Sequence, residues 1–332
     1  MRNFKTLIKP IGYLITALSV GYLCTIIAGL DWQVLKFESP LKSFFWIFLF
    51  GVWASLFVLV GAYNWKLILD FLGGTSLPLK DVFSVYLRSN VAKYLPGNVM
   101  HLAGRNFLGS RLGWNNSEIA FSSLLEMVLG LGLTGLIIAA FVAAGMVNLP
   151  PQVPLRLDCD RIAWYAAIAA AGLLFSVLFI YAYRLLVHRE TPAETSVKLY
   201  GRGKQFVSTR FLLLLGKMAL LSLACFVLNC AFYFYLCDLV LGFRLNAADF
   251  FNANTALAIA GYFGVLTPGA PGGLGVRESV SMLLLSAYGY PKEALVLSLI
   301  VFRVVCTLGD LFPYLVVKAC GGRRIEGTDS SS

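Results

Sequence analysis

The chain has 332 residues, of which 58% are hydrophobic and 13% are charged, and its mean hydropathy is +0.77. Soluble domains contain about 25% charged residues, so this composition excludes an ordinary soluble protein. The formal net charge of +10 would suggest nucleic-acid binding in a soluble chain, but in a membrane protein it indicates basic cytoplasmic loops.

Long apolar segments recur along the chain, each near the length of about 20 residues that a membrane-spanning helix needs. The first, at 11–30, contains no charged residue and is longer than the apolar core of a secretory signal peptide. We therefore expect an all-α polytopic membrane protein with about six full spans. The predicted spans are 11–30, 44–69, 119–146, 162–187, 211–241 and 294–317.

Two further segments are apolar but too short to cross, and each is broken by a Pro-Gly pair. One contains KYLPGNVMHLAGR and the other LTPGAPGGLGVRE, and in both an arginine stands nine positions after the proline. Proline interrupts a helix and glycine permits a tight turn, so each segment is predicted to be a helical hairpin, at about 79–110 and 249–289. The residues of the predicted turns are Pro96, Gly97, Pro268, Gly269, Gly272 and Gly273, and the two arginines are Arg105 and Arg277.

The distribution of basic residues predicts the topology of the chain. Lys and Arg concentrate in alternate loops, which places both termini in the cytoplasm. The hairpins then enter the membrane from opposite faces as re-entrant hairpins of an inverted-repeat-like fold, a pattern that points to a central transport site. The alternative is two ordinary loops. We expect one membrane domain over 1–320 and a polar, disordered cytoplasmic tail over 321–332.

The two motifs, KYLPGNV…GR and PGGLGVRE, together with the apolar segments, resemble the flippase-like membrane domain of the lysylphosphatidylglycerol synthase family. The resemblance covers about 5–318 and implies movement of lipids between leaflets. Some members of that family join this domain to a soluble aminoacyl-transferase domain, which is missing here. Lysyl transfer is therefore not carried over to this chain, and a lysyl-lipid cargo is in doubt.

Charged side chains within the apolar segments are the candidate substrate-binding residues. Each costs about 2.5–3.5 kcal/mol on insertion scales, so such residues normally face a polar interior. We hypothesise a polar cavity in which cations bind a lipid phosphate, while acids balance them or bind a coupling proton or an amine. The alternative is a set of intramolecular ion pairs. The candidates are Arg105, Arg277, Glu278, Arg303, Glu126 and Asp310.

Other polar residues of these segments are interpreted as structural. Lys93 is interpreted as an anchor at the membrane interface. Asn252, Asn254 and Thr255 would either line the same cavity or join helices, and we favour the second interpretation.

Two other functions compete with lipid translocation. One is a non-transporting membrane scaffold for a separate lipid-modifying enzyme. The other is a polyprenyl-phosphate-sugar-dependent glycosyltransferase, for which Asp158 and Asp160 in a predicted outer loop would supply the acids. Motifs of nucleotide binding, nucleophilic catalysis and metal coordination are absent from the sequence, so we expect no enzymatic activity, cofactor, metal or nucleic-acid partner. The expected cargo is a membrane lipid, in a bacterial plasma membrane.

Overall fold

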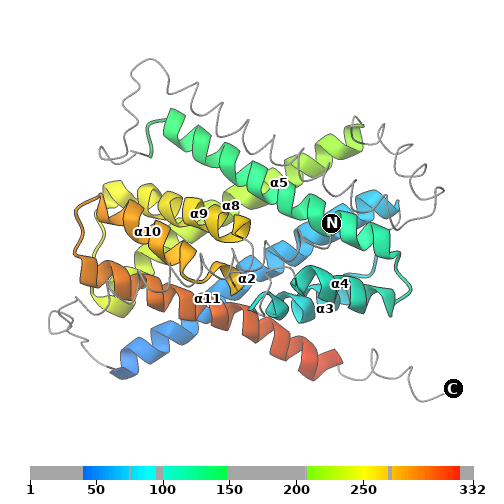
Figure 1. Ribbon diagram of the computed structural model, residues 1–332, viewed down its shortest axis with the longest axis horizontal. Coiled ribbons are helices and arrows are strands. Elements are labelled where there is room, and N and C mark those ends of the chain that lie inside the picture. Colours follow the sequence, from blue (N-terminus) through cyan, green and yellow to red (C-terminus); the bar gives the residue numbers. More distant parts are fainter. Residues whose placement is uncertain are drawn as a thin grey trace, which may run out of the picture.

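The regular elements of the computed structural model are all helical, which confirms the all-α part of the predicted fold class for the described residues, 40–74, 76–94, 100–147, 206, 208–267 and 271–321 (Figure 1). The long helices are α2 (Pro40–Gly73), α5 (Asn116–Ala143), α8 (Thr209–Leu241) and α11 (Lys292–Gly321). The short helices are α3 (Leu79–Asn90), α4 (Met100–Ser110), α9 (Phe250–Leu266) and α10 (Val276–Ser286). Single turns of 3₁₀ helix are η2 (Val91–Tyr94), η4 (Ala247–Asp249) and η5 (Pro271–Gly273).

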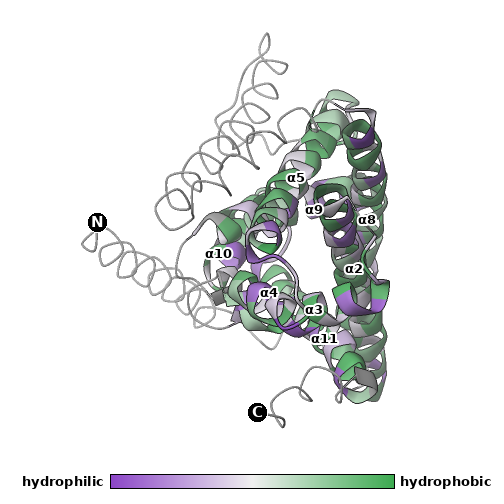
Figure 2. Ribbon diagram, turned by 90° about the vertical axis from the view of Figure 1, so that its right-hand side faces the viewer, coloured by the Kyte–Doolittle hydropathy of each residue, from purple (hydrophilic) through white to green (hydrophobic). Residues whose placement is uncertain are grey.

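The long helices α2, α5, α8 and α11 are long and apolar enough to cross a membrane. They coincide with the spans predicted at 44–69, 119–146, 211–241 and 294–317, so the chain is a membrane protein. In Figure 2, α2 and α8 are mainly hydrophobic, whereas α3 and α4 contain more hydrophilic residues. The predicted spans 11–30 and 162–187 lie outside the described residues. Of the tail predicted over 321–332, Gly321 is the last residue of α11 and so does not belong to a tail, and the residues from 322 onward lie outside the described residues.

The described helices follow the same order twice along the chain: a long helix, a pair of short helices and a second long helix. The first half is α2, α3, α4 and α5, and the second is α8, α9, α10 and α11. Corresponding long helices run in opposite directions in Figure 1, α2 against α8 and α5 against α11. The short helices of each pair pack on each other, and η2 contacts η5, so the inner ends of the two pairs meet.

Small residues let α2 and α11 cross closely (Figure 1). A Cβ atom added at Gly309 would lie 2.4 Å from the Cβ of Ala54, and one added at Gly51 would lie 3.1 Å from the Cβ of Leu308. Packing through small residues is typical of helices in membranes, where close van der Waals contact drives association. This crossing fixes the position of α11, which carries Arg303 and Asp310.

Local sequence explains where several helices begin and end. α5 begins after Asn115, whose side chain accepts a hydrogen bond from the Ser117 amide at 2.9 Å. α9 ends at Leu266, and Thr267 is extended, as the residue before a proline prefers. The predicted turn residues Pro96, Gly97, Pro268 and Gly269 lie outside the described residues, whereas Gly272 and Gly273 have φ angles of +56° and +72°.

Candidate functional site

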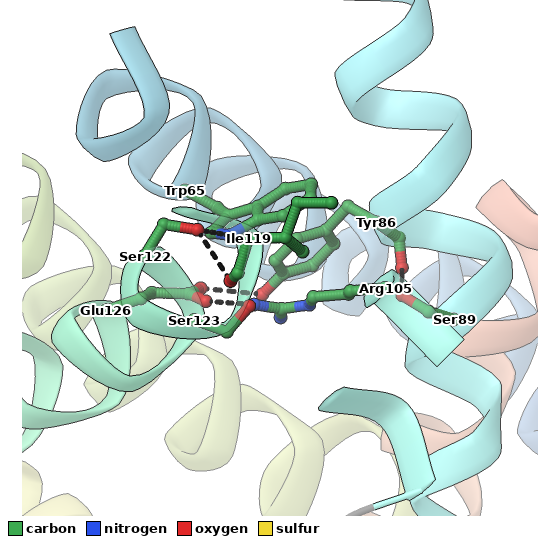
Figure 3. A network of polar contacts seen from close by, with 8 residues as sticks. All are labelled: Trp65, Tyr86, Ser89, Arg105, Ile119, Ser122, Ser123 and Glu126. Carbon is green, nitrogen blue, oxygen red and sulfur yellow. Dashed lines mark hydrogen bonds and ion pairs between the residues drawn. The ribbon is translucent and has the colours of Figure 1, made fainter. Parts of the chain in front are cut away.

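A buried ion pair joins α4 to α5 in the first half. Arg105 is only 3% exposed, and its Nη1 lies 2.5 Å from Oε2 of Glu126. The Tyr86 hydroxyl on α3 donates a second hydrogen bond to Glu126, to Oε1 at 3.0 Å (Figure 3). Burial of a charged group is tolerated only when it is paired and hydrogen-bonded, and here both conditions are met.

Aromatic rings enclose the guanidinium of this pair. The Cζ atom of Arg105 lies 4.1 Å from the ring centroid of Tyr86 and 4.9 Å from that of Trp65 (Figure 3). Trp65 is held in turn by α5, because its Nε1 donates to Oγ of Ser122 at 2.9 Å. Four helices, α2 to α5, therefore meet at one arginine. We call Trp65, Tyr86, Arg105, Ser122 and Glu126 the Arg105 network.

A second buried charge, Asp310 on α11, holds the inner end of the first short pair. Its carboxylate is 3% exposed and accepts hydrogen bonds from Asn90 Nδ2 at 2.7 Å, Lys93 Nζ at 2.8 Å and the Tyr94 hydroxyl at 2.5 Å. Lys93, interpreted from the sequence as an interfacial anchor, instead binds this buried carboxylate. The three donors come from the end of α3 and from η2, so Asp310 fastens that segment to α11.

Arg303, also on α11, holds the inner end of the second short pair. Its Nη2 donates to the carbonyl oxygen of Gly272 at 2.9 Å. Its Nη1 lies 3.8 Å from Oε1 of Glu278, which is a loose ion pair, and its guanidinium lies 5.9 Å from the ring centroid of Tyr94. The other carboxylate oxygen of Glu278 accepts a hydrogen bond from the Gly275 amide at 2.7 Å, at the start of α10.

Glycines make this meeting point possible. A Cβ atom at Gly272 would lie 2.8 Å from Nη2 of Arg303 and 3.6 Å from the ring of Tyr94. A Cβ atom at Gly264 would lie 2.3 Å from Cγ of Arg277, and one at Gly273 would lie 2.8 Å from Cα of Gly264. The absence of side chains therefore lets α9, η5 and the stem of Arg277 lie directly on one another.

The Arg277 guanidinium is the exception among the predicted site charges. It is partly exposed, and among the residues that the structure describes none forms a hydrogen bond or an ion pair with it. Cys306 on α11 lies within electrostatic range of Arg277, Arg303, Lys93 and Asp310. We call the cluster formed by Lys93, Tyr94, Gly272, Arg277, Glu278, Arg303 and Asp310 the tip junction.

The structure thus divides the predicted site residues into two groups. Arg277, Glu278, Arg303 and Asp310 lie at the tip junction, whereas Arg105 and Glu126 form the Arg105 network. The two groups are linked through α3, where Tyr86 and Asn90 are four residues apart on one face.

Sequence reasoning missed the neutral residues that contact these charges directly or through a neighbour, which are Trp65, Tyr86, Asn90, Tyr94 and Ser122. Aromatic residues in an apolar helix are not distinguishable by pattern from core residues, and only the position of Asn90 and Tyr94 just before the Pro-Gly break was a usable signal. Asn254 donates to the Phe226 carbonyl at 3.2 Å and so joins α9 to α8, as interpreted. No group of three or more metal-binding side chains occurs in the described part of the chain.

Comparisons with known proteins give one match. The family model described as "Lysylphosphatidylglycerol synthase TM region" matches residues 10–312 of the chain. No curated protein and no solved structure matches the chain.

Proposed function

Because this chain belongs to the family of the lysylphosphatidylglycerol synthase TM region, as its motifs predict, we propose that it moves a lipid headgroup between the leaflets of the membrane. The family itself indicates a membrane protein with a lipid-related role. The cargo in this proposal is a phospholipid or a lipid-linked headgroup, whose phosphate binds at the tip junction. No chemical step is needed, so the protein acts as a transporter and not as an enzyme.

The lengths of the short helices support a re-entrant arrangement. Helices α3, α4, α9 and α10 have 12, 11, 17 and 11 residues, which at about 1.5 Å per residue amounts to about 16–26 Å. The hydrocarbon core is about 30 Å thick, so none of them crosses it comfortably. Two hairpins that enter from opposite faces would bring η2 and η5 together inside the membrane. Irregular backbone is tolerated at that depth where protein covers it or a polar cavity adjoins it.

The observation that carries the proposal is the guanidinium of Arg277, with which no described residue forms a hydrogen bond or an ion pair. A charge at membrane depth without a protein partner is costly, so it needs a ligand of opposite charge. Arg277 lies in the first turn of α10, where free amides add a positive potential that favours an anion. Arg303 lies across the glycine turn from it. Two guanidinium groups and a helix start form a suitable site for a phosphate.

The proposal also includes the membrane location, the partners and the driving force. The basic loops favour a plasma membrane location with both termini in the cytoplasm. The cargo lipid is the main partner, and a separate enzyme that modifies the lipid is a second one. The driving force would be a gradient, the membrane potential or consumption of the lipid on the far side.

A second candidate, a membrane scaffold without transport, is favoured by the Arg105 network. All the charge of that network is neutralised within the protein, as expected for a purely structural element. A scaffold would neutralise the charges of the predicted site in this way, so Arg277 is the predicted site residue that separates the two functions. The predicted acids of a glycosyltransferase, Asp158 and Asp160, lie outside the described residues.

Charge reversal at Arg277 tests the proposal. Purified wild-type protein and the Arg277→Glu variant are placed in vesicles with a fluorescent tracer of the lipid that co-purifies with the wild type. Accessibility of the tracer to dithionite then measures lipid movement. We expect movement by the wild type and a fall to the rate of protein-free vesicles in the variant.

The matched control is Arg244→Glu, which reverses an 85% exposed arginine away from the tip junction and should transport normally. Equal transport by Arg277→Glu and wild type would refute the phosphate site. Absence of transport by the wild type would favour the scaffold.

A further inference from the structure

The charges of the tip junction select among the lipids that this proposed transport site would accept. Three cations, Lys93, Arg277 and Arg303, and two acids, Glu278 and Asp310, are brought together there, which leaves one positive charge in excess. On this basis, which rests on the proposed function, we infer that the cargo is a phosphodiester lipid with a single negative charge and a hydroxyl-bearing headgroup that is otherwise uncharged.

Among the described residues, neighbouring charges do not alter this balance. Arg105 and Glu126 neutralise each other. Arg88 on α3 has buried Nε and Nη2 atoms without a partner among the described residues. It stands two residues before Asn90, about 200° around α3, so it lies on the face opposite to the one that binds Asp310. The connecting residues 95–99 and 268–270 contain no Asp, Glu, Lys or Arg, and neither do the apolar segments 11–30 and 162–183.

An excess of one charge is selective because most of the site is shielded from solvent. Asp310 is 3% exposed, and the side chains of Arg303 and Glu278 are 19% and 15% exposed, whereas Lys93 is 32% exposed and Arg277 is partly exposed. A monoanionic phosphodiester makes the occupied site neutral. A zwitterionic lipid leaves the positive charge uncompensated, and a phosphomonoester or pyrophosphate adds an uncompensated negative charge, which is strongly unfavourable away from water.

The carboxylate of Glu278 is the reason why we infer a headgroup with hydroxyl groups. If Arg277 and Arg303 bind the phosphate, the loose contact of Arg303 with Glu278 is released, and Oε1 of Glu278 becomes free to accept a hydrogen bond. Its other oxygen stays on the Gly275 amide, which holds the carboxylate in place. A polyol or sugar next to the phosphate would supply the hydroxyl donor.

A selectivity measurement tests the inference. Vesicles with purified full-length protein receive one of three acyl-chain-labelled lipids: phosphatidylglycerol, zwitterionic phosphatidylethanolamine, or phosphatidic acid, a monoester with a charge of about −1.5 to −2 at pH 7. We expect phosphatidylglycerol to move at least about tenfold faster than either of the others, a difference of about 1.4 kcal/mol. Mass spectrometry of bound lipid then distinguishes a glycerophospholipid from a polyprenyl-phosphate sugar, which shares the same phosphodiester chemistry.

Two variants shift the charge balance in opposite directions. Arg277→Gln removes the excess charge and should reduce the preference for phosphatidylglycerol over phosphatidylethanolamine to about onefold to threefold. Glu278→Gln adds an excess charge and should favour phosphatidic acid over phosphatidylglycerol. Arg244→Gln makes the same charge change as Arg277→Gln at an 85% exposed position and should leave the order unchanged.

The outcomes separate the two levels of the proposal. If the wild type moves no lipid, the transport function itself fails. If it moves all three lipids equally, or prefers the zwitterion or the monoester, transport stands and the inferred cargo class is wrong. If the variants are inactive, the order of rates in the wild type still decides whether the inferred cargo class is correct.

Discussion

The two halves of the molecule carry ion pairs in equivalent places, and the pairs differ in almost every respect. Arg105 on α4 binds Glu126 on α5 at 2.5 Å, whereas Glu278 on α10 and Arg303 on α11 remain 3.8 Å apart. In the first pair the arginine lies on the short helix and the acid on the long helix, and in the second pair this arrangement is reversed. Only the first pair is enclosed by aromatic rings. The comparison teaches that residues of the same types form a tight pair in one half and a loose pair in the other, and the loose pair is where we propose that a ligand binds.

Breaking the tight pair should have the largest effect on stability. Glu126→Gln leaves the Arg105 guanidinium buried without a counter-charge, which should lower the free energy of unfolding by about 3–5 kcal/mol. Denaturant titration in detergent, followed by tryptophan fluorescence, measures the loss. The double variant Arg105→Met with Glu126→Met should recover most of it, because no isolated charge remains. A double variant as unstable as the single one would contradict this account of the pair.

Weakening the clamp on α11 should have an intermediate effect. Asp310→Asn removes the charge that three donors share and should cost about 2 kcal/mol, since hydrogen bonds to charged groups contribute about 1.5–3 kcal/mol each. The matched control is Asp238→Asn, whose partner Arg244 is 85% exposed, and which should change stability by less than about 1 kcal/mol. Equal losses in the two variants would show that burial of Asp310 is unimportant.

The loose pair should matter little for stability. Glu278→Gln keeps an oxygen for the Gly275 amide and loses only the contact at 3.8 Å, so the free energy of unfolding should fall by less than about 1 kcal/mol. Lipid movement by the same variant should nevertheless change. A stability loss as large as that of Glu126→Gln would mean that the two pairs have the same role.

The smallest effect is expected at the outer ends of the short pairs. In the second half, the Tyr290 hydroxyl, in the loop before α11, donates to Asp249 at 2.5 Å and accepts from the Asn246 amide at 2.9 Å. Burial, together with the hydrogen bond to Asp249, raises the pKa of Tyr290 to about 12. In the first half, Asp70 has the corresponding place and accepts a hydrogen bond from the Leu77 amide at 2.9 Å.

Because a tyrosine hydroxyl holds this place in the second half and an aspartate holds it in the first, we predict that alkaline pH destabilises the second half. The folded state retains the Tyr290 proton at pH values where the unfolded chain, with a tyrosine pKa of about 10, has lost it. The stabilisation is therefore complete below about pH 10 and is lost as the pH rises toward about 12. Unfolding measured between these pH values should show the loss in the wild type and a smaller one in Tyr290→Phe. Identical pH profiles would assign the sensitivity to other groups.

Much of the fold was predictable because apolar length and Pro-Gly breaks are local properties. The helices α2, α5, α8 and α11 lie where hydropathy predicts spans, and α9 ends one residue before Thr267-Pro268. The structure adds that α10 begins at Val276, so Arg277 and Glu278 belong to its first turn. The re-entrant placement of the hairpins stays a prediction.

The sequence predicted the charged residues of the candidate site but not the contacts between them. Arg105 and Arg277 stand at the same distance from their Pro-Gly breaks. Arg105 is enclosed and paired, whereas Arg277 forms no hydrogen bond or ion pair with any described residue. Lys93 looked like an interfacial residue and instead binds Asp310, which is 217 residues away along the chain. Contacts between distant helices cannot be derived from the spacing of residues within one helix.

The sequence by itself determined that this is a helical membrane protein of a lipid-related family, because composition and local motifs fix hydropathy, helix breaks and family. The tertiary structure alone decided which charges cancel and which remain available. That decision depends on which helices lie side by side, and glycines at positions 272 and 309 allow the close approaches. An ion pair at 2.5 Å and one at 3.8 Å therefore arise from residues of the same types.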